Sequence, residues 1–177
     1  RPLRLTPAWA PPANGRGPVL ELIDQYDFWQ GMLNTLRLTL WGALWALVIG
    51  TVVAIMRLSP VRVLQWAGAT YVTLLRNTPL TLIVVAANLV LGIQLQLALV
   101  ARDDPQFITV NNFRLAILAL AVYHASFVCE ALRSGVNTIP VGQAEAARSL
   151  GMTFGQNLRH VILPQAFRGA ITPLGNV

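Results

Sequence analysis

The chain has 177 residues, of which 55% are hydrophobic and only 11% are charged, and its net charge is +6. A soluble domain carries about 25% charged residues, so much of this surface is expected to face something other than water. The positive charge comes from arginine alone and flanks long apolar runs, which favours a lipid bilayer over nucleic acid as the partner.

The N-terminal part of the chain predicts a tail followed by a membrane span. Residues 1–18 are rich in proline and glycine and predict a flexible tail, and residues 19–177 predict one transmembrane domain. Residues 19–31 mix apolar and acidic side chains at helical spacing, which is typical of an interfacial helix. The uncharged run that follows matches a hydrocarbon core of roughly 30 Å, so the first span is expected at about 35–57.

Two further spans are predicted in the middle of the chain. Thr78 is a candidate N-cap and Pro79 a candidate first helical residue, so the second span is expected over about 79–98. The third span is expected over about 113–132, between a polar loop and an arginine. Its uncharged core is short for a bilayer, which indicates that protein covers at least one of its sides.

The distribution of arginine predicts the orientation in the membrane. Three spans put the linker after the first span on the same side as the segment that follows the third. Arginine is denser near the span ends on that side, because the arginines of the tail lie far from any span. The positive-inside rule therefore predicts an outside N-terminus and a cytoplasmic loop over about 137–164. Tyr71 and Arg76 are expected at the level of the lipid headgroups.

The polar stretch QAEAARSLG predicts a short helix and a turn on that cytoplasmic side. Residues 143–150 are good helix formers, and Glu145 is expected in the first turn, where the helix dipole favours a carboxylate. Gly151 suits the left-handed position that follows a helix C-terminus. Residues 153–156 read as a capping box that opens a second helix, which Pro164 is expected to end.

The run GQAEAARSLGMTFGQNLRHVILP resembles the EAA loop of binding-protein-dependent ABC importer permeases, in which E-A-A is followed by a glycine and then by I-x-L-P. The matching positions are Glu145, Ala146, Ala147, Gly151, Ile162, Leu163 and Pro164. The motifs RNTPLTL, NNFRLA and AEAARSLG resemble, in particular, permease subunits of actinobacterial glutamate uptake systems. The resemblance covers about residues 30–177.

The resemblance implies an all-α, polytopic membrane protein with the type I transmembrane fold of ABC importers. This chain would hold three spans, the coupling helices and the start of a fourth span, and so be truncated at its C-terminus. The implied activity is transport of a polar amino acid, glutamate in that branch of the family, across the plasma membrane, and not catalysis. Many polar amino-acid permeases have tyrosine three residues before the glutamate of the third span, where this chain has Phe127 before Glu130.

The resemblance also implies a set of partners. The matching positions of the EAA loop would bind a separate ABC ATPase, and an extracellular solute-binding protein would deliver the substrate. A second permease subunit, identical or a sister protein, would complete the path. No catalytic residue, cofactor or metal is expected, and a chain without lysine cannot hold a Walker-A ATP site.

Four polar residues in the predicted spans are candidates for the substrate path. His124, Ser126 and Glu130 lie in the third span and Asn88 in the second, and intramembrane ionisable groups usually face a cavity or a partner. Glu130 has an alternative role, because it lies at the end of its span and can pair with Arg133 three residues on. Asn88 can instead bond to a neighbouring helix.

Two other functions remain open from the residues alone. A channel or membrane scaffold that works without an ATPase explains the spans but not the capped double helix around Gly151. A membrane-embedded enzyme requires a reactive constellation, and only isolated polar residues are visible in the sequence.

Overall fold

The computed structural model describes residues 28–175. The predicted tail over 1–18 lies outside these residues, as does most of the predicted interfacial helix over 19–31. The chain divides into two compact units, Arg1–Arg37 and Leu38–Val177. The described part of the first unit is helical throughout, and the packing discussed below belongs to the second unit.

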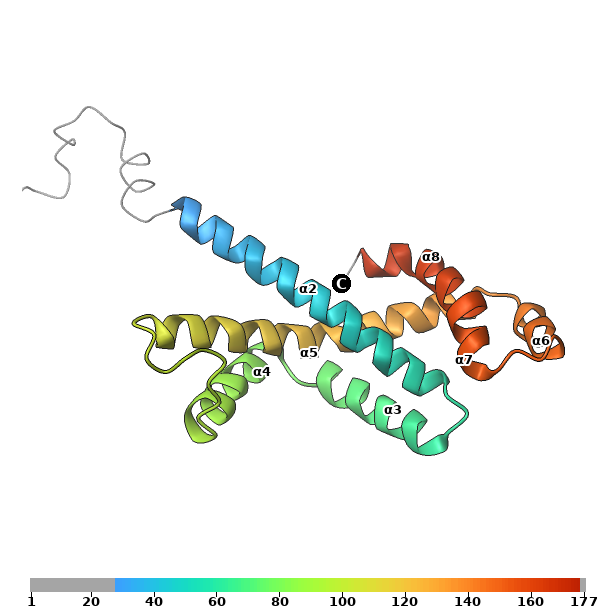
Figure 1. Cartoon of the computed structure of the whole chain (residues 1–177), viewed down its shortest axis with the longest axis horizontal. Coiled ribbons are helices and arrows are strands. Elements are labelled where there is room, and N and C mark those ends of the chain that lie inside the picture. The colour runs from blue at the N-terminus through green and yellow to red at the C-terminus, as the bar shows by residue number, and fades with distance from the viewer. Residues whose placement is uncertain (1–27, 176–177) are drawn as a thin grey trace, which may run out of the picture. The chain divides into compact units, whose positions relative to one another are not determined.

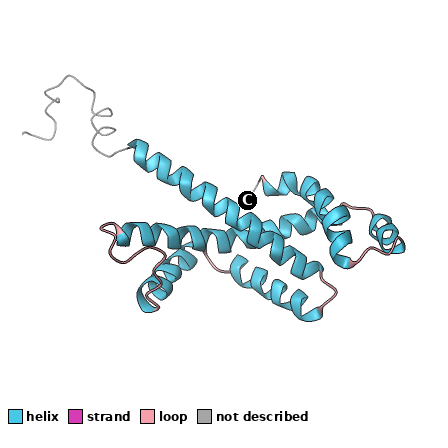
Figure 2. Ribbon diagram, in the orientation of Figure 1, coloured by secondary structure: helices cyan, strands magenta, loops and turns pink. Residues whose placement is uncertain are grey.

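The described residues form helices joined by short loops, as Figure 2 shows. In chain order the elements are α2 (Phe28–Leu58), α3 (Arg62–Arg76), α4 (Leu80–Ala86), η1 (Ala87–Gln94), α5 (Phe107–Asn137), α6 (Val141–Ser149), α7 (Phe154–Asn157), η2 (Leu158–Ile162) and α8 (Leu163–Leu174). The elements η1 and η2 are π-helical. The prediction of an all-α protein is confirmed.

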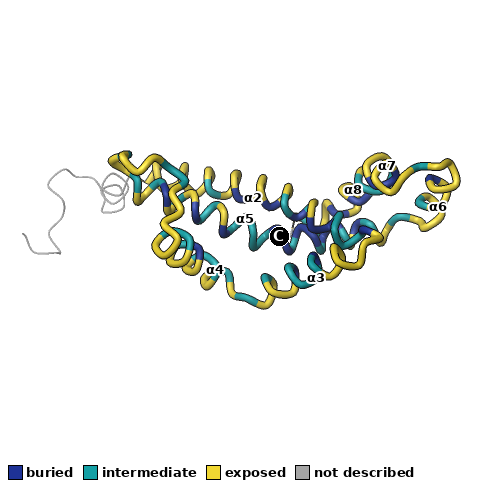
Figure 3. The backbone as a smooth tube through the Cα atoms, turned by 60° about the horizontal axis from the view of Figure 1, so that its bottom comes forward, coloured by how far each residue is buried: buried dark blue, intermediate teal, exposed yellow. Residues whose placement is uncertain are grey.

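Helix α5 is the central element of the second unit, and α3, α4, η1 and α8 all pack against it (Figure 1). Its buried face carries mostly small side chains, which lets the neighbouring helices approach closely. Burial is concentrated where α2, α3, α5 and α8 meet, whereas α6 and α7 are mainly exposed (Figure 3). The core cluster consists of Ala46, Val53, Ala54, Val72, Val128, Cys129, Leu132 and Ala170.

Two of these helices are long and apolar enough to cross a membrane. They are α2 and α5, with 31 residues each and mean hydropathies of 2.1 and 1.9 in their most apolar windows. Both helices are longer than the predicted spans. Helix α2 covers Phe28–Leu58 where about 35–57 was expected, and α5 covers Phe107–Asn137 where about 113–132 was expected. Residues 107–112, which were predicted as part of a loop, therefore belong to the helix.

The chain returns between α2 and α5 through a bent helix pair. An ion pair joins Arg57, in the last turn of α2, to Glu130, two turns before the end of α5. Earlier in the two helices Gly42 lies against Leu120 and Gly50 against Val128, so the helices run in the same direction. The segment between them must therefore cross back once. Helix α3 and the α4–η1 helix can do so as one span bent by 102°.

The bent pair corrects the prediction for residues 57–98. The expected linker contains α3, whose Gly68 lies against the Arg57 side chain and the Val53 carbonyl. The helix expected over 79–98 ends at Gln94, which is too short to span a bilayer alone. Thr78 is not an N-cap, because its hydroxyl donates back to the Leu74 carbonyl (2.8 Å).

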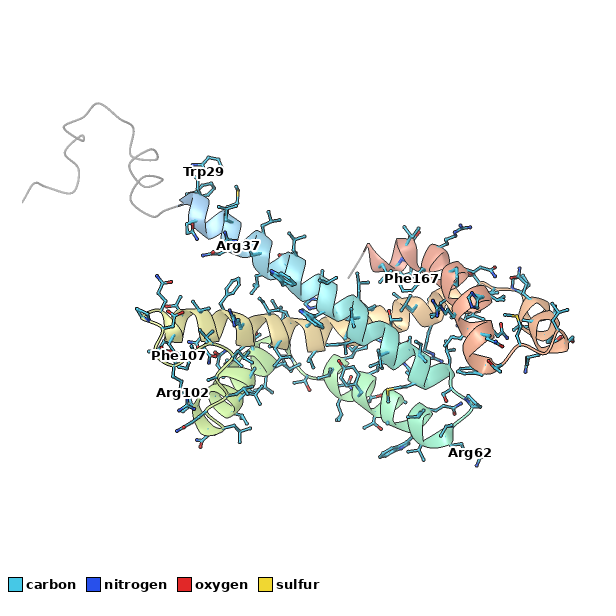
Figure 4. The ribbon with its side chains drawn as sticks, in the orientation of Figure 1. Trp29, Arg37, Arg62, Arg102, Phe107 and Phe167 are labelled. Atoms are coloured by element: carbon cyan, nitrogen blue, oxygen red, sulfur yellow. The ribbon has the colours of Figure 1, made fainter. Side chains whose placement is uncertain are left out.

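Tyr71 contacts the middle of α5, which indicates a position deeper than the predicted headgroup level for Tyr71 and for Arg76, which follows it in α3. The Tyr71 hydroxyl donates to the carbonyl of Val122 (2.6 Å), and Val122 is the midpoint of α5. Arg62 is the first residue of α3, and Arg102 lies in the loop that follows η1, as the labelled side chains in Figure 4 show. The end of α3 therefore lies beside the middle of α5, whereas Arg62 and Arg102 lie near the outer ends of the bent pair.

We expect Gly135→Ala to lower the stability of the folded permease by about 1–3 kcal/mol. A Cβ at this position would overlap the backbone carbonyl of Ala166 in α8, and a backbone group cannot turn aside. Thermal unfolding of the purified protein in detergent measures the effect. Gly142→Ala is the matched control, since a Cβ there meets nothing within 4 Å, and an equal loss in both variants would contradict the packing.

Candidate functional site

The ion pair between α2 and α5 is the centre of a small charged cluster. Glu130 accepts from Arg57 on one side and lies 3.6 Å from Arg133 on the other. The Arg57 side chain is only 14% exposed, and its guanidinium also lies 3.9 Å from the sulfur of Cys129. Glu130 therefore pairs with Arg133 as the sequence indicates, but its more deeply buried partner is Arg57, 73 residues away.

His124 lines an apolar groove between α2 and α5. The groove encloses about 480 Å³ and is lined on α2 by small and aliphatic residues that include Gly42 and Ala46. The imidazole Nδ1 lies 2.9 Å from the Leu120 carbonyl, an acceptor, so Nδ1 carries the proton of this hydrogen bond. Leu174 of α8 also lines the groove.

The side chains of the other two path candidates donate hydrogen bonds to carbonyls three or four residues earlier in the chain. Ser126 is fully buried, and its hydroxyl donates to the Tyr123 carbonyl (2.7 Å), so it borders no open path in the described part of the chain. Asn88 lies in the π-helical η1 and donates to the Val84 carbonyl (3.0 Å). The structure thus buries Ser126 in the core around α5, places Glu130 half-buried in the charged cluster, and leaves Asn88 half-buried on a separate helix.

The EAA segment, residues 137–164, begins with the short helix α6. The helix starts at Val141, two residues earlier than predicted, so Glu145 is its fifth residue and not in its first turn. The carboxylate is exposed and makes no hydrogen bond or ion pair with any residue of 28–175, so Glu145 does not hold the turn within this chain. Ala147 is buried inside the segment, which leaves Ala146 as the exposed alanine of the pair.

The turn after α6 is a Schellman motif, as the glycine indicates. Gly151 has φ +78°, its N–H donates to the Arg148 carbonyl (2.9 Å), and the Met152 N–H donates to the Ala147 carbonyl (3.1 Å). These bonds satisfy the last carbonyls of α6. The prediction of a left-handed glycine at this position is confirmed.

The capping box at the start of α7 is also confirmed. The Gln156 N–H donates to the Thr153 hydroxyl (3.4 Å), and the Thr153 N–H donates to the Gln156 side chain (2.9 Å). Buried Asn157 then donates to the Ala144 carbonyl (3.2 Å), which joins α7 back to α6. This hydrogen bond therefore holds the two short helices together as one hairpin.

Pro164 does not end the second helix, which corrects the prediction. The chain passes from α7 through η2 into α8 without a break, and Pro164 occupies the first turn of α8. Proline is tolerated there because a π-helical turn precedes it, so the usual i→i−4 hydrogen bond of the helix is interrupted at this point. Ile162 and Leu163 are half-buried at this junction, while Pro164 is exposed.

Exposed apolar side chains on the hairpin were not predicted from the sequence. Leu150 is 83% exposed, and Val141 and Phe154 are 70% and 43% exposed. They lie on two short polar helices and the turn between them, none of which is long enough to span a bilayer. Exposed apolar groups on such a segment are typical of a protein-docking surface.

Residues 46–177 match the family described as binding-protein-dependent transport system inner membrane component. The chain belongs to this family. The family and the apolar helices make it a multi-pass component of the plasma membrane, as the sequence predicts. The predicted resemblance to ABC importer permeases is also confirmed.

Two relatives show which kinds of permease this chain is similar to. The glutamate transport system permease protein GluC of Corynebacterium glutamicum is 49% identical over 142 residues, which cover 80% of this chain and 62% of that protein. The probable glutamine ABC transporter permease protein GlnM of Bacillus subtilis is 35% identical over 88% of this chain and 67% of its own length. The chain thus spans about 62% of the length of GluC.

A solved structure matches the fold of this family member. The crystal structure of an amino acid ABC transporter with histidines matches with a TM-score of 0.65 and 29% sequence identity. The match covers 91% of this chain and 70% of that chain. The arrangement of α2 to α8 is therefore that of an amino-acid ABC transporter.

We expect the charged cluster to stabilise the contact between α2 and α5. Glu130→Gln leaves Arg57 without a carboxylate, and we expect a loss of about 2 kcal/mol, between the values for exposed and buried pairs. Arg57→Gln should cost a similar amount, and the two changes together should cost less than their sum.

A double-mutant cycle on thermal stability in detergent measures this coupling. Arg133→Gln is the control, because Arg133 is more exposed and lies 3.6 Å from Glu130. Full additivity of the changes at Arg57 and Glu130 would contradict a stabilising pair.

Proposed function

We propose that this chain is the transmembrane subunit of an ATP-binding-cassette importer for a polar amino acid, and that glutamate is its substrate. The observation that carries the proposal is the 49% identity to the glutamate permease GluC over 80% of the chain. The family match and the likeness to an amino acid ABC transporter support the same class of transporter. The permease would not hydrolyse ATP itself, because that reaction belongs to a separate ATPase subunit.

The EAA segment is the proposed contact with the ATPase. Its matching residues are Glu145, Ala146, Ala147, Gly151, Ile162, Leu163 and Pro164, to which the exposed Leu150 and Phe154 add an apolar surface. The Schellman motif, the capping box and the bond from Asn157 support a hairpin that moves as one body. Such a hairpin can transmit a displacement of the ATPase to α5 and α8, between which it lies in the sequence.

The proposed orientation puts this segment in the cytoplasm and the N-terminus outside. The paired ends of α2 and α5 support a common side for the Arg57–Glu130 cluster and the EAA segment. An extracellular solute-binding protein would deliver the amino acid to the opposite face. A second permease subunit, identical or related, would complete the path, to which His124, Asn88 and Glu130 contribute in this proposal.

An ATPase-independent channel or scaffold is the alternative function. This alternative provides no binding partner for the exposed apolar side chains of the hairpin. Co-purification of the full-length permease with an ATPase encoded beside it, followed by glutamate uptake in proteoliposomes with the binding protein, tests the proposal. Glutamate uptake that is independent of ATP, or a permease that retains no ATPase, would contradict it.

We expect Leu150→Ala to reduce co-purification of the ATPase by about tenfold, which corresponds to about 1.4 kcal/mol and is typical for truncation of one exposed anchor at an interface. Arg148→Ala is the matched control, because Arg148 is exposed on the same helical turn but is not apolar. Unchanged recovery of the ATPase with Leu150→Ala would exclude this apolar contact.

The conformation of Gly151 gives a second test of the hairpin. A Cβ at this position meets nothing within 4 Å, but φ +78° strains most side chains, whereas asparagine adopts it more readily. We therefore expect Gly151→Ala to lower glutamate-stimulated ATPase activity in the assembled importer more than Gly151→Asn does. Equal activity in wild type and Gly151→Ala would show that this backbone conformation is not required.

A further inference from the structure

Arg76 is a cation in the middle of the membrane-spanning part of the chain. It is the last residue of α3 and lies at the 102° bend that separates α3 from α4. Five residues before it, the Tyr71 hydroxyl donates to the carbonyl of Val122, the midpoint of α5. The bend and its arginine are therefore near the centre of the span, and not at its edge.

The surroundings of Arg76 contain aromatic rings but no carboxylate. Its guanidinium carbon lies 5.4 Å from the centre of the Phe127 ring, and the rings of Tyr123 and His124 lie 5.2 Å and 6.4 Å from Phe127. The side chain is exposed and makes no ion pair with any residue of 28–175. The sequence itself has no Asp or Glu between Asp27 and Asp103, which excludes an acidic neighbour on α2, α3, α4 or η1. The one acidic residue of α5 is Glu130, which pairs with Arg57 and Arg133 and not with Arg76.

An unpaired charge at this depth is costly, and such residues usually face a ligand path or a partner. Transporters commonly bind substrate near the bilayer midplane, where a helix is interrupted. The guanidinium is planar, and its donors match the two oxygens of a carboxylate. A ring beneath the guanidinium stabilises the cation through its π face while leaving the edge donors free.

We propose that Arg76, held over Phe127 at the break between α3 and α4, binds a carboxylate of the amino acid during its passage. This inference rests on the proposed transport function and adds the residue that recognises the anionic group. Glutamate offers this carboxylate at its α-carbon and at its side chain. Phe127 is a positioning residue, because it contacts the guanidinium and not the substrate.

The test uses the complete importer, purified in detergent with its ATPase and second permease subunit but without the binding protein. Binding of glutamate, glutamine and isoglutamine is measured by thermal stabilisation, because the two amides each replace one of the two carboxylates. We expect R76Q to weaken glutamate binding by about ten- to a hundredfold, the effect of losing a charged hydrogen bond. R76Q should also reduce the preference of the wild type for glutamate over one of the amides.

The matched control is R102Q, since Arg102 is also exposed but donates to the Gln96 carbonyl in a loop at the end of the span. It should leave binding unchanged. F127L retains the cation and removes the ring beneath it, so we expect a smaller loss of affinity than in R76Q. R76K retains the charge but not the planar donors and should also bind glutamate less tightly than the wild type.

Two results would overturn the proposal. The first is wild-type glutamate affinity and amide discrimination in R76Q. The second is failure of R76Q to assemble while R76K and F127L bind glutamate normally, which assigns Arg76 to a subunit or lipid contact. Both differ from failure of the proposed function, in which the wild-type permease retains no ATPase and takes up no amino acid.

Discussion

The ion pair between Arg57 and Glu130 determines how the rest of the second unit is arranged. It joins the end of α2 to the C-terminal part of α5. Together with the approach of Gly50 to Val128, it makes these helices run in the same direction, so the intervening chain must return. The return path is α3, which passes close to Arg57 at Gly68 and reaches the middle of α5 at Tyr71. The depth of the bend follows from these contacts, because a helix of fixed rise can climb only so far in 15 residues.

Much of the local structure could be predicted from the sequence, because it depends on neighbouring residues. The apolar run of α2, the left-handed Gly151 and the Thr153–Gln156 capping box are all examples. Each is determined within a few positions by side-chain volume, backbone freedom or a hydrogen bond. The start of α6 was less predictable, since helix ends depend on small differences among residues such as Val141 and Gln143.

The predictions were wrong where contacts between residues far apart in the sequence determine the structure. Residues 57–76 have an arginine at each end, which is typical of an exposed linker, but they contain a helix that buries Gly68 and Val72 against its neighbours. Thr78 and Pro79 form a plausible helix start, yet the hydroxyl of Thr78 bonds to the preceding helix. The same limit applied to the candidate site. The sequence did not indicate that Arg57 is a partner of Glu130, because the two residues are 73 positions apart.

Cys129 is the only cysteine of the chain and is fully buried beside Arg57. A water-soluble maleimide requires an accessible thiol, so the native protein should be nearly silent toward such reagents while it is folded. A cysteine introduced at an exposed position of α6 or of the loop before α5 would then be the one labelled. The sidedness of each segment can therefore be mapped chemically in intact cells, without first removing the natural thiol from the core.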